Sequence, residues 1–289
     1  MTTTLSKTEI DNYWNDGYLF PKRVMSVETA NALRIELEQL EADWLDNGLT
    51  LPLNTYKRIN AQMVMPIAHE IGVMDSILDV VEGVLGPDIM LYSTELLIKE
   101  ARTKNVVTMH QDLTYWGMGE IDGLTTAWLA LSPATRESGC MDFVQASHKN
   151  PILPHEDSFD DHNLLSRGQE IKVDVSPEDR VAVELEPGEI SLHHGLTIHG
   201  SGPNVSNDRR IGVVLRYLTP KIKKTGGERD YAHLARGADT DGNWQPYLVP
   251  QTPFAEENLA VYTAARTLQT SVMMSGAKKS GAFYDKADK

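Results

Sequence analysis

The chain has 289 residues, enough for one sizeable domain, and its 41% hydrophobic content is typical of a packed globular protein. Its formal net charge of −14 argues against a surface for nucleic acid or anionic membranes, because both need clusters of Lys and Arg. A single cysteine, Cys140, excludes an internal disulfide, and no stretch has the roughly 20 apolar residues that cross a bilayer. Without a signal-peptide or peroxisomal pattern, the sequence predicts a cytoplasmic protein and leaves its oligomeric state open.

The first part of the chain, about residues 1–88, predicts mainly helices that brace another layer. Ser6 followed by Glu9 is typical of a capping box at a helix N-terminus. Ser26 is a second candidate N-cap, and apolar residues recur at helical spacing after it, from Ala30 to Trp44.

From residue 89 to about 220 the pattern changes to short runs typical of strands. These runs are IMLYSTELLIK, LTTAWLAL, MDFV, VAVEL, EISLHH and IGVVLRYL, with turn-rich segments between them. They predict an antiparallel sandwich or barrel. The polar stretch 153–180 predicts a long, lid-like excursion. The C-terminal extension 221–289 returns to helical spacing over 254–272, and nothing divides the chain, so we expect one domain over 1–289.

The segment TMHQDLTYW carries the first candidate metal ligands. His110 and Asp112 are two residues apart, so their side chains can point the same way on an extended backbone. Two histidines and one carboxylate are ligands that iron(II) accepts while other coordination positions stay open. A second pair with this spacing, His155 and Asp157, lies in an acidic, loop-like stretch, and we favour the first pair because strand-like runs flank it.

A third ligand is expected from a later strand. The stretch ISLHHGLTIHGSGPN offers three candidates, His193, His194 and His199, and spacing alone does not choose among them.

Together, TMHQDLTYW, IHGSGPN and the following RRIG resemble the phytanoyl-CoA dioxygenase family of iron(II)- and 2-oxoglutarate-dependent oxygenases, which also includes ectoine hydroxylase. The resemblance runs from about Gly17 to Tyr217. It implies a mainly β fold with flanking helices, built on a double-stranded β-helix, the jelly-roll core of cupins. One departure lies in VQASHK, where Ala146 replaces the usual glycine.

The resemblance implies a ligand set of His110, Asp112 and His199 for Fe(2+). It also implies that Arg210, eleven residues after His199, binds the distal carboxylate of 2-oxoglutarate and that Ser201 assists it. With O2 as the oxidant, the implied reaction is hydroxylation of a small-molecule metabolite, with release of succinate and carbon dioxide. Halogenating relatives replace the carboxylate ligand with Ala or Gly, so Asp112 favours hydroxylation or another oxidation.

Five further residues are candidates for the substrate or cosubstrate pocket, and each has a structural alternative. They are Tyr92, Lys99, Tyr115, Trp116 and His193. Tyr92 and Lys99 lie on the run before the ligand pair, although a lysine there could also be solvated at a strand edge. The two aromatic neighbours could stack on substrate or fill the barrel. His193 has the same strand parity as His199, so on a regular strand it would face the cavity.

The substrate and two other function classes stay open. Phytanoyl-CoA itself is disfavoured as the substrate, because the sequence has no cluster of Lys and Arg that could bind the CoA phosphates. The negative net charge weakly favours a cationic substrate. One alternative is a cupin-like metal-binding protein without redox turnover. Another is a hydrolase or isomerase that uses a divalent metal on the same barrel. Arg210 argues against both, because neither needs a cosubstrate anchor.

Overall fold

A computed structural model of the chain describes residues 4–114, 116–119, 121–157, 162–165, 169–171 and 175–273. The helices in this part of the chain are α1 (Lys7–Asp16), α2 (Val27–Trp44), α3 (Leu53–Arg58), α4 (Pro66–Gly72), α5 (Asp75–Leu85) and α6 (Glu256–Met273). The strands are β1 (Tyr18–Arg23), β2 (Ile89–Lys99), β3 (Val107–His110), β4 (Leu124–Ala130), β5 (Met141–Val144), β6 (His155–Asp157), β7 (Gln169–Ile171), β8 (Arg180–Val183), β9 (Glu189–His194), β10 (His199–Ser201), β11 (Arg210–Leu218) and β12 (His233–Arg236).

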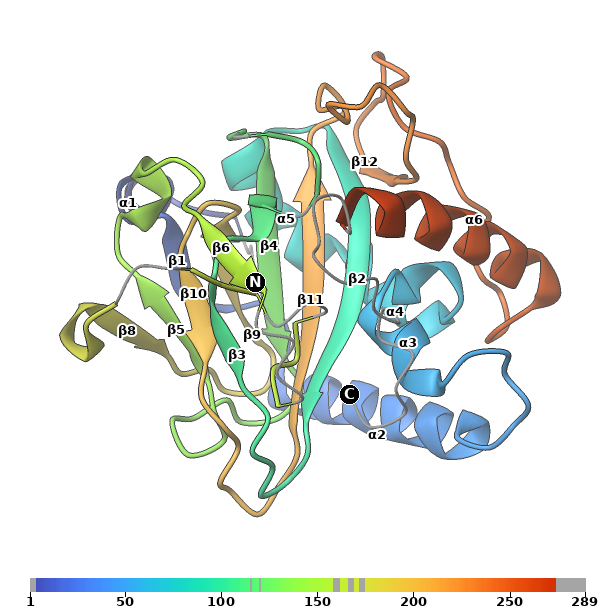
Figure 1. Ribbon diagram of the computed structural model, residues 1–289, viewed down its shortest axis with the longest axis horizontal. Coiled ribbons are helices and arrows are strands. Elements are labelled where there is room, and N and C mark those ends of the chain that lie inside the picture. Colours follow the sequence, from blue (N-terminus) through green and yellow to red (C-terminus); the bar gives the residue numbers. More distant parts are fainter. Residues whose placement is uncertain are drawn as a thin grey trace.

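Two antiparallel sheets form the core of the molecule (Figure 1). The larger sheet has the strand order β1-β9-β4-β11-β2-β12, and the smaller one has the order β3-β10-β5-β8. Strands that are neighbours in a sheet lie far apart in the sequence, as in a jelly roll. The prediction of a mainly β, jelly-roll fold with flanking helices is therefore confirmed.

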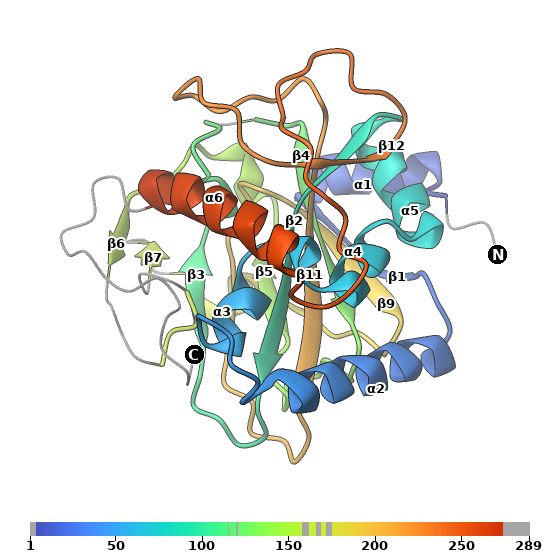
Figure 2. The same ribbon diagram turned by 90° about the vertical axis from the view of Figure 1, so that its right-hand side faces the viewer.

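The helices cover one face of the larger sheet (Figure 2). Alternation along β11 explains this arrangement, because Ile211, Val213 and Leu215 are fully buried in one apolar cluster with residues of the helices. The residues between them, from Arg210 to Arg216, point to the other face, towards the smaller sheet. The helices therefore brace the sheet from outside and leave its inner face for the cavity.

Several local predictions are confirmed, and the structure has strands that the sequence did not predict. Ser6 caps α1 with a full capping box, and Ser26 caps α2. The runs MDFV and EISLHH coincide with β5 and β9. The sequence did not reveal β1, which joins the larger sheet beside β9, because its six residues, YLFPKR, do not alternate apolar with polar types and include a proline.

The excursion after Leu153 lies partly outside the described residues, at 158–161, 166–168 and 172–174. Its described parts form the two-stranded pair of β6 with β7 and a contact beside β3, where Leu164 N donates to Val106 O at 2.8 Å. This segment therefore adjoins the edge of the smaller sheet.

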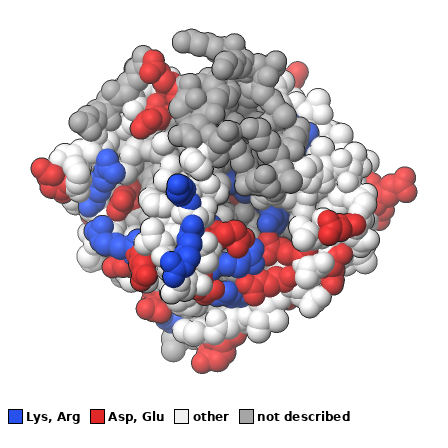
Figure 3. All heavy atoms as spheres, turned by 60° about the horizontal axis from the view of Figure 1, so that its bottom comes forward, with Lys and Arg blue, Asp and Glu red and all other residues white. Residues whose placement is uncertain are grey.

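Charged groups of both signs are interspersed on the face that looks towards the bottom of Figure 1 (Figure 3). Ion pairs between α2 and the start of β11 account for part of this pattern, since Arg34 pairs with Asp208 at 2.7 Å and Arg209 with Glu41 at 2.9 Å. Among the described helices, none is both long and apolar enough to span a membrane.

Candidate metal centre

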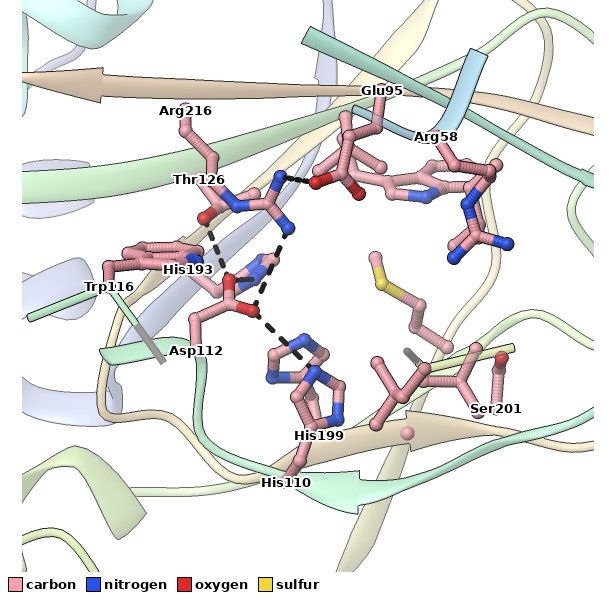
Figure 4. Close-up of a pocket in the computed structure, with 17 residues that line it drawn as sticks. Arg58, Glu95, His110, Asp112, Trp116, Thr126, His193, His199, Ser201 and Arg216 are labelled. Carbon is pink, nitrogen blue, oxygen red and sulfur yellow. Dashed lines mark hydrogen bonds and ion pairs between the residues drawn. The ribbon is translucent and has the colours of Figure 1, made fainter. Parts of the chain in front are cut away.

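Three potential metal ligands meet where β3 and β10 lie side by side. His110 ends β3, Asp112 follows in a short 3-10 turn, and His199 begins β10 opposite His110 in the antiparallel register. One donor atom from each residue lies within 4.8 Å of the donors of the other two, and all three residues are buried (Figure 4). In the part of the chain that the structure describes, this is the only such group of His, Cys, Asp and Glu.

Backbone carbonyls fix the orientation of both histidine rings. His110 Nδ1 lies 2.9 Å from Thr108 O, and His199 Nδ1 lies 2.9 Å from Thr197 O. A carbonyl only accepts hydrogen bonds, so each Nδ1 carries the proton and each Nε2 keeps a lone pair. Burial and the neighbouring His110 lower the pKa of His199 well below its usual value, so this ring is neutral at pH 7. The two Nε2 lone pairs can therefore bind a divalent metal.

The Asp112 carboxylate is also kept in the form that binds metal. Burial alone would raise the pKa of Asp112, but the charge of Arg216 and the contacts with His110 and His193 hold it well below its usual value. Its two oxygens have different surroundings. Oδ1 lies 3.5 Å from His110 Nε2 and 3.9 Å from Arg216 Nη2, whereas Oδ2 accepts a hydrogen bond from Thr126 Oγ1 at 3.0 Å.

A glycine allows the two ligand strands to approach each other. A Cβ atom at Gly200 would lie 2.7 Å from Val107 O and 3.1 Å from Met109 N, too close for any other residue. The glycine in the H-G-S-G segment therefore has a steric role, because it lets β10 lie against β3 and brings His199 beside His110.

The three residues line a cavity between the two sheets. Other charged or polar groups around it are Arg58, Glu95, Thr126, His193, Ser201 and Arg216, and the apolar walls include Leu97, Trp116, Trp128, Met141 and Val214. Three of the predicted pocket or cosubstrate residues, His193, Trp116 and Ser201, thus share one cavity with the candidate ligands. A largely apolar cavity with a few convergent polar groups is typical of a small-molecule site.

Arg210 and Lys99 lie directly behind this cavity, fully buried and opposite each other on β11 and β2. Arg210 Nη1 donates to Gly139 O at 2.6 Å, but its Nε and Nη2 have no hydrogen-bond partner among the described residues. Lys99 Nζ donates to Ser201 Oγ at 2.7 Å. Burial lowers the pKa of Arg210 to about 10, and burial with the charge of Arg210 lowers the pKa of Lys99 to about 6.

Trp128 and a second glycine shape the cationic end of the site, which Arg210 and Lys99 form. The Arg210 guanidinium lies 5.2 Å from the centre of the Trp128 ring. A Cβ atom at Gly212 would lie only 2.0 Å from that ring, so the glycine makes room for the indole. Arg209, one residue away, instead pairs with Glu41 and Glu100 on the outer surface, as strand alternation predicts.

Tyr92 and Lys99, which were also predicted for the pocket, do not line the cavity. Tyr92 is buried in a separate network, where its hydroxyl donates to Asp230 Oδ2 at 3.0 Å and accepts from Lys224 Nζ at 2.8 Å. Tyr115 lies outside the described residues. His155, from the alternative ligand pair, uses both ring nitrogens for hydrogen bonds, to Leu153 O and to the backbone N–H of Gln111.

Sequence analysis missed four polar residues of this cavity, namely Arg58, Glu95, Thr126 and Arg216. Two of them carried a usable signal. Arg216 has the strand parity of Arg210, and Glu95 has that of Lys99, so both had to face the cavity if the strands were regular. They form a direct ion pair there, and the Arg216 guanidinium lies 4.7 Å from the centre of the Trp116 ring.

Comparisons with known proteins agree with this geometry. The sequence model of the family described as "Phytanoyl-CoA dioxygenase (PhyH)" matches residues 13–212. A Caenorhabditis elegans protein named "Probable phytanoyl-CoA dioxygenase" is 30% identical over 163 residues, which cover 54% of this chain and 52% of that protein. The chain spans about half the length of the curated relatives it matches.

Solved structures resemble the chain over nearly its whole length. The apo form of the non-heme monooxygenase ThoJ has a TM-score of 0.82 and 30% identity, and the match covers 92% of this chain and 97% of ThoJ. The structure titled "CytC3 with Fe(II) and alpha-ketoglutarate" has a TM-score of 0.64 at 19% identity, covering 88% of this chain and 97% of CytC3. At that identity the second match shows the shared fold alone.

Proposed function

Because the chain belongs to the phytanoyl-CoA dioxygenase family, we propose that it is a non-haem iron(II)- and 2-oxoglutarate-dependent dioxygenase that hydroxylates a small-molecule metabolite. One observation carries the proposal: His110, Asp112 and His199 converge with both Nε2 lone pairs available and the carboxylate ionised. Two imidazoles and one carboxylate are the donor set of non-haem iron(II) oxygenases. When bound there, iron(II) and 2-oxoglutarate supply the oxidising chemistry, which consumes O2 and releases succinate and carbon dioxide.

The cationic end of the cavity suits the distal carboxylate of 2-oxoglutarate. Arg210 is a buried cation with two N–H donors unpartnered among the described residues, and such donors are costly unless a ligand satisfies them. Among the described residues, no carboxylate is a charged neighbour that shifts the pKa of Arg210 or Lys99. Arg210 would bind the carboxylate bidentately, Ser201 would assist, and Lys99 would hold the Ser201 hydroxyl in position.

The charges of the proposed site balance. Iron(II) brings two positive charges, Asp112 one negative, 2-oxoglutarate two negative and Arg210 one positive, so their sum is zero. A cofactor-free metal site would gain nothing from a buried arginine at this place. This favours the oxygenase over a non-redox cupin-like protein and over a metal-dependent hydrolase or isomerase.

The substrate would be a small metabolite that reaches the cavity near Trp116, Glu95 and Arg216. The apolar walls would limit the access of water to the reacting centre. A Stutzerimonas stutzeri relative is named "Probable alpha-ketoglutarate-dependent hypophosphite dioxygenase", so the relatives of this chain include one named for a small substrate. The proposed compartment is the cytoplasm, since the sole cysteine, Cys140, is a buried free thiol.

An anaerobic titration with iron(II) and then 2-oxoglutarate tests the proposal. The chelated cosubstrate should give a weak visible charge-transfer band, which should decay with formation of succinate when O2 is admitted. Decay that becomes faster with an added metabolite would identify a substrate. Metal binding without the band would refute the proposal and favour a non-redox metal site.

A further inference from the structure

His193 is a buried histidine whose ring has no hydrogen bond to any residue that the structure describes. It lies on β9, is 1% exposed and lines the cavity. Among the residues that the structure describes, neither Nδ1 nor Nε2 of His193 has a hydrogen-bond partner. Buried polar atoms in native proteins are nearly always satisfied, so an imidazole with two unsatisfied nitrogens beside a metal site needs an explanation.

The position of the ring points to one carboxylate oxygen. His193 Nε2 lies 3.5 Å from Asp112 Oδ2, on the side of the carboxylate that also accepts from Thr126 Oγ1 (Figure 4). The other oxygen, Oδ1, faces His110 Nε2 at 3.5 Å. His193 is not part of the group whose donor atoms all lie within 4.8 Å of one another. Its ring packs between neighbouring rings, 4.4 Å from that of His199 and 5.1 Å from that of Phe143, centre to centre.

We propose that His193 is a positioning residue that donates a hydrogen bond from Nε2 to Asp112 Oδ2 in the metal-loaded protein. Together with Thr126 it holds this oxygen away from the metal, so that Asp112 binds through Oδ1 alone. The inference rests on the proposed metal site and goes beyond it, because it gives a role to a residue that is none of the three proposed ligands.

The number of Asp112 oxygens that bind the metal matters, because the metal has a limited number of coordination positions. A metal held by three protein donors would need its other positions free for the cosubstrate and for O2. A carboxylate that binds through both oxygens would take one of these positions. Two donors on Oδ2 therefore protect cosubstrate binding more than metal binding.

Four variants separate this role from packing and from direct ligation. His193→Phe keeps an aromatic ring beside Phe143 and removes the N–H, whereas His193→Gln keeps an N–H donor. Thr126→Val removes the second donor to Oδ2, and Thr126→Ser keeps it. Metal affinity is measured by calorimetry with Ni(II), and 2-oxoglutarate affinity by the charge-transfer band of the iron(II) form.

We expect His193→Phe to weaken 2-oxoglutarate binding about 10- to 100-fold, the range in which loss of a hydrogen bond to a metal ligand lowers metal affinity or activity. Ni(II) affinity should fall by less, because all three ligands remain. His193→Gln should restore much of the loss, and Thr126→Val should weaken 2-oxoglutarate binding in the same direction, while Thr126→Ser should not. If both His193→Phe and Thr126→Val bound 2-oxoglutarate with wild-type affinity, His193 and Thr126 would have only a packing role, and the proposal would be wrong. Loss of Ni(II) binding in His193→Phe would make His193 a ligand and overturn the proposal.

Crystal structures of the Ni(II) forms provide a readout that needs no cosubstrate. The wild-type structure should have Asp112 Oδ1 alone on the metal, and the His193→Phe structure should have both oxygens on it. Bidentate Asp112 in the wild type would overturn the inference even if 2-oxoglutarate binds. If the wild type binds metal through Oδ1 alone but gives no charge-transfer band, the proposed function fails while the role of His193 stands.

Discussion

The two faces of the larger sheet carry opposite kinds of side chain, although the same strands supply both. On β11 the residues Ile211, Val213 and Leu215 face the helices and are fully buried among apolar neighbours. Arg210 and Arg216, on the alternate positions, point towards the smaller sheet, where Arg216 lines the cavity and Arg210 lies behind it. The side chains on one face of the strand thus contribute to stability and those on the other to the site. A shift of the strand register by one residue would exchange the two sets of side chains.

Substitutions on the two faces should therefore change different measurements. The cavity face should affect binding of metal and cosubstrate, and the helix face should affect unfolding.

The largest effect is expected at the metal ligands. His110→Ala removes one of three donors, and since loss of a mere partner of a ligand costs about 10- to 100-fold, loss of the ligand itself should cost more than about 100-fold in metal affinity. Ni(II) calorimetry measures the affinity, and circular dichroism checks the fold. Turnover of 2-oxoglutarate should vanish. Wild-type consumption of 2-oxoglutarate in both His110→Ala and Asp112→Ala would contradict the ligand assignment.

At the cationic end, Arg210→Ala should weaken 2-oxoglutarate binding about 10- to 100-fold, because a charge-assisted hydrogen bond contributes about 1.5–3 kcal/mol. Ni(II) affinity should change far less, since the guanidinium touches none of the three ligands. Arg209→Ala is the matched control, one residue away on the outer surface, and should leave cosubstrate affinity unchanged. If Arg209→Ala weakens 2-oxoglutarate binding and Arg210→Ala does not, the assignment of Arg210 as the residue that binds the cosubstrate carboxylate is wrong.

On the helix face, Leu215→Ala should lower the free energy of unfolding by about 2–5 kcal/mol, the usual cost of emptying a buried leucine site. Urea denaturation measures this change. Metal and cosubstrate affinities of the folded variant should stay within about twofold of the wild type. A large loss of affinity without a loss of stability would mean that the two faces are not independent.

Sequence patterns predicted several strands directly. The runs at 89–99 and 189–194 coincide with β2 and β9, because apolar residues recur along IMLYSTELLIK and stand at alternate positions in EISLHH. The short strands β3 and β10 are not among the predicted runs, although they carry His110 and His199. Their pairing joins segments nearly 90 residues apart, and no local pattern reports it.

The candidate site was predictable to the extent that its residues belong to a motif. The ligand set and Arg210 came from the resemblance, while Arg216 and Thr126 were missed because their contacts with Asp112 exist only after three strands assemble. Ala146, which departs from the family pattern, adopts a left-handed φ of 57°, so the turn keeps the conformation that glycine favours.

The smallest predicted effect concerns Lys99 and the pH dependence of stability. Burial and the charge of Arg210 lower the pKa of Lys99 to about 6, against about 10.4 for an exposed lysine. Between these values the unfolded chain binds more protons than the folded chain, so this group makes stability rise with pH. Lys99→Met should therefore flatten the rise between pH 6.5 and 8.5 in urea denaturation.

The matched control is Lys7→Met, whose side chain is exposed on α1 and should leave the slope unchanged. An equal slope in Lys99→Met and the wild type would mean that Lys99 keeps its proton in the folded state. The cavity face would then hold two permanent cations behind Ser201, and 2-oxoglutarate would bind without proton uptake. A flattened slope would instead mean that Lys99 is neutral in the folded protein near pH 7, so that Arg210 alone supplies the positive charge behind Ser201 and the charges of the proposed site sum to zero.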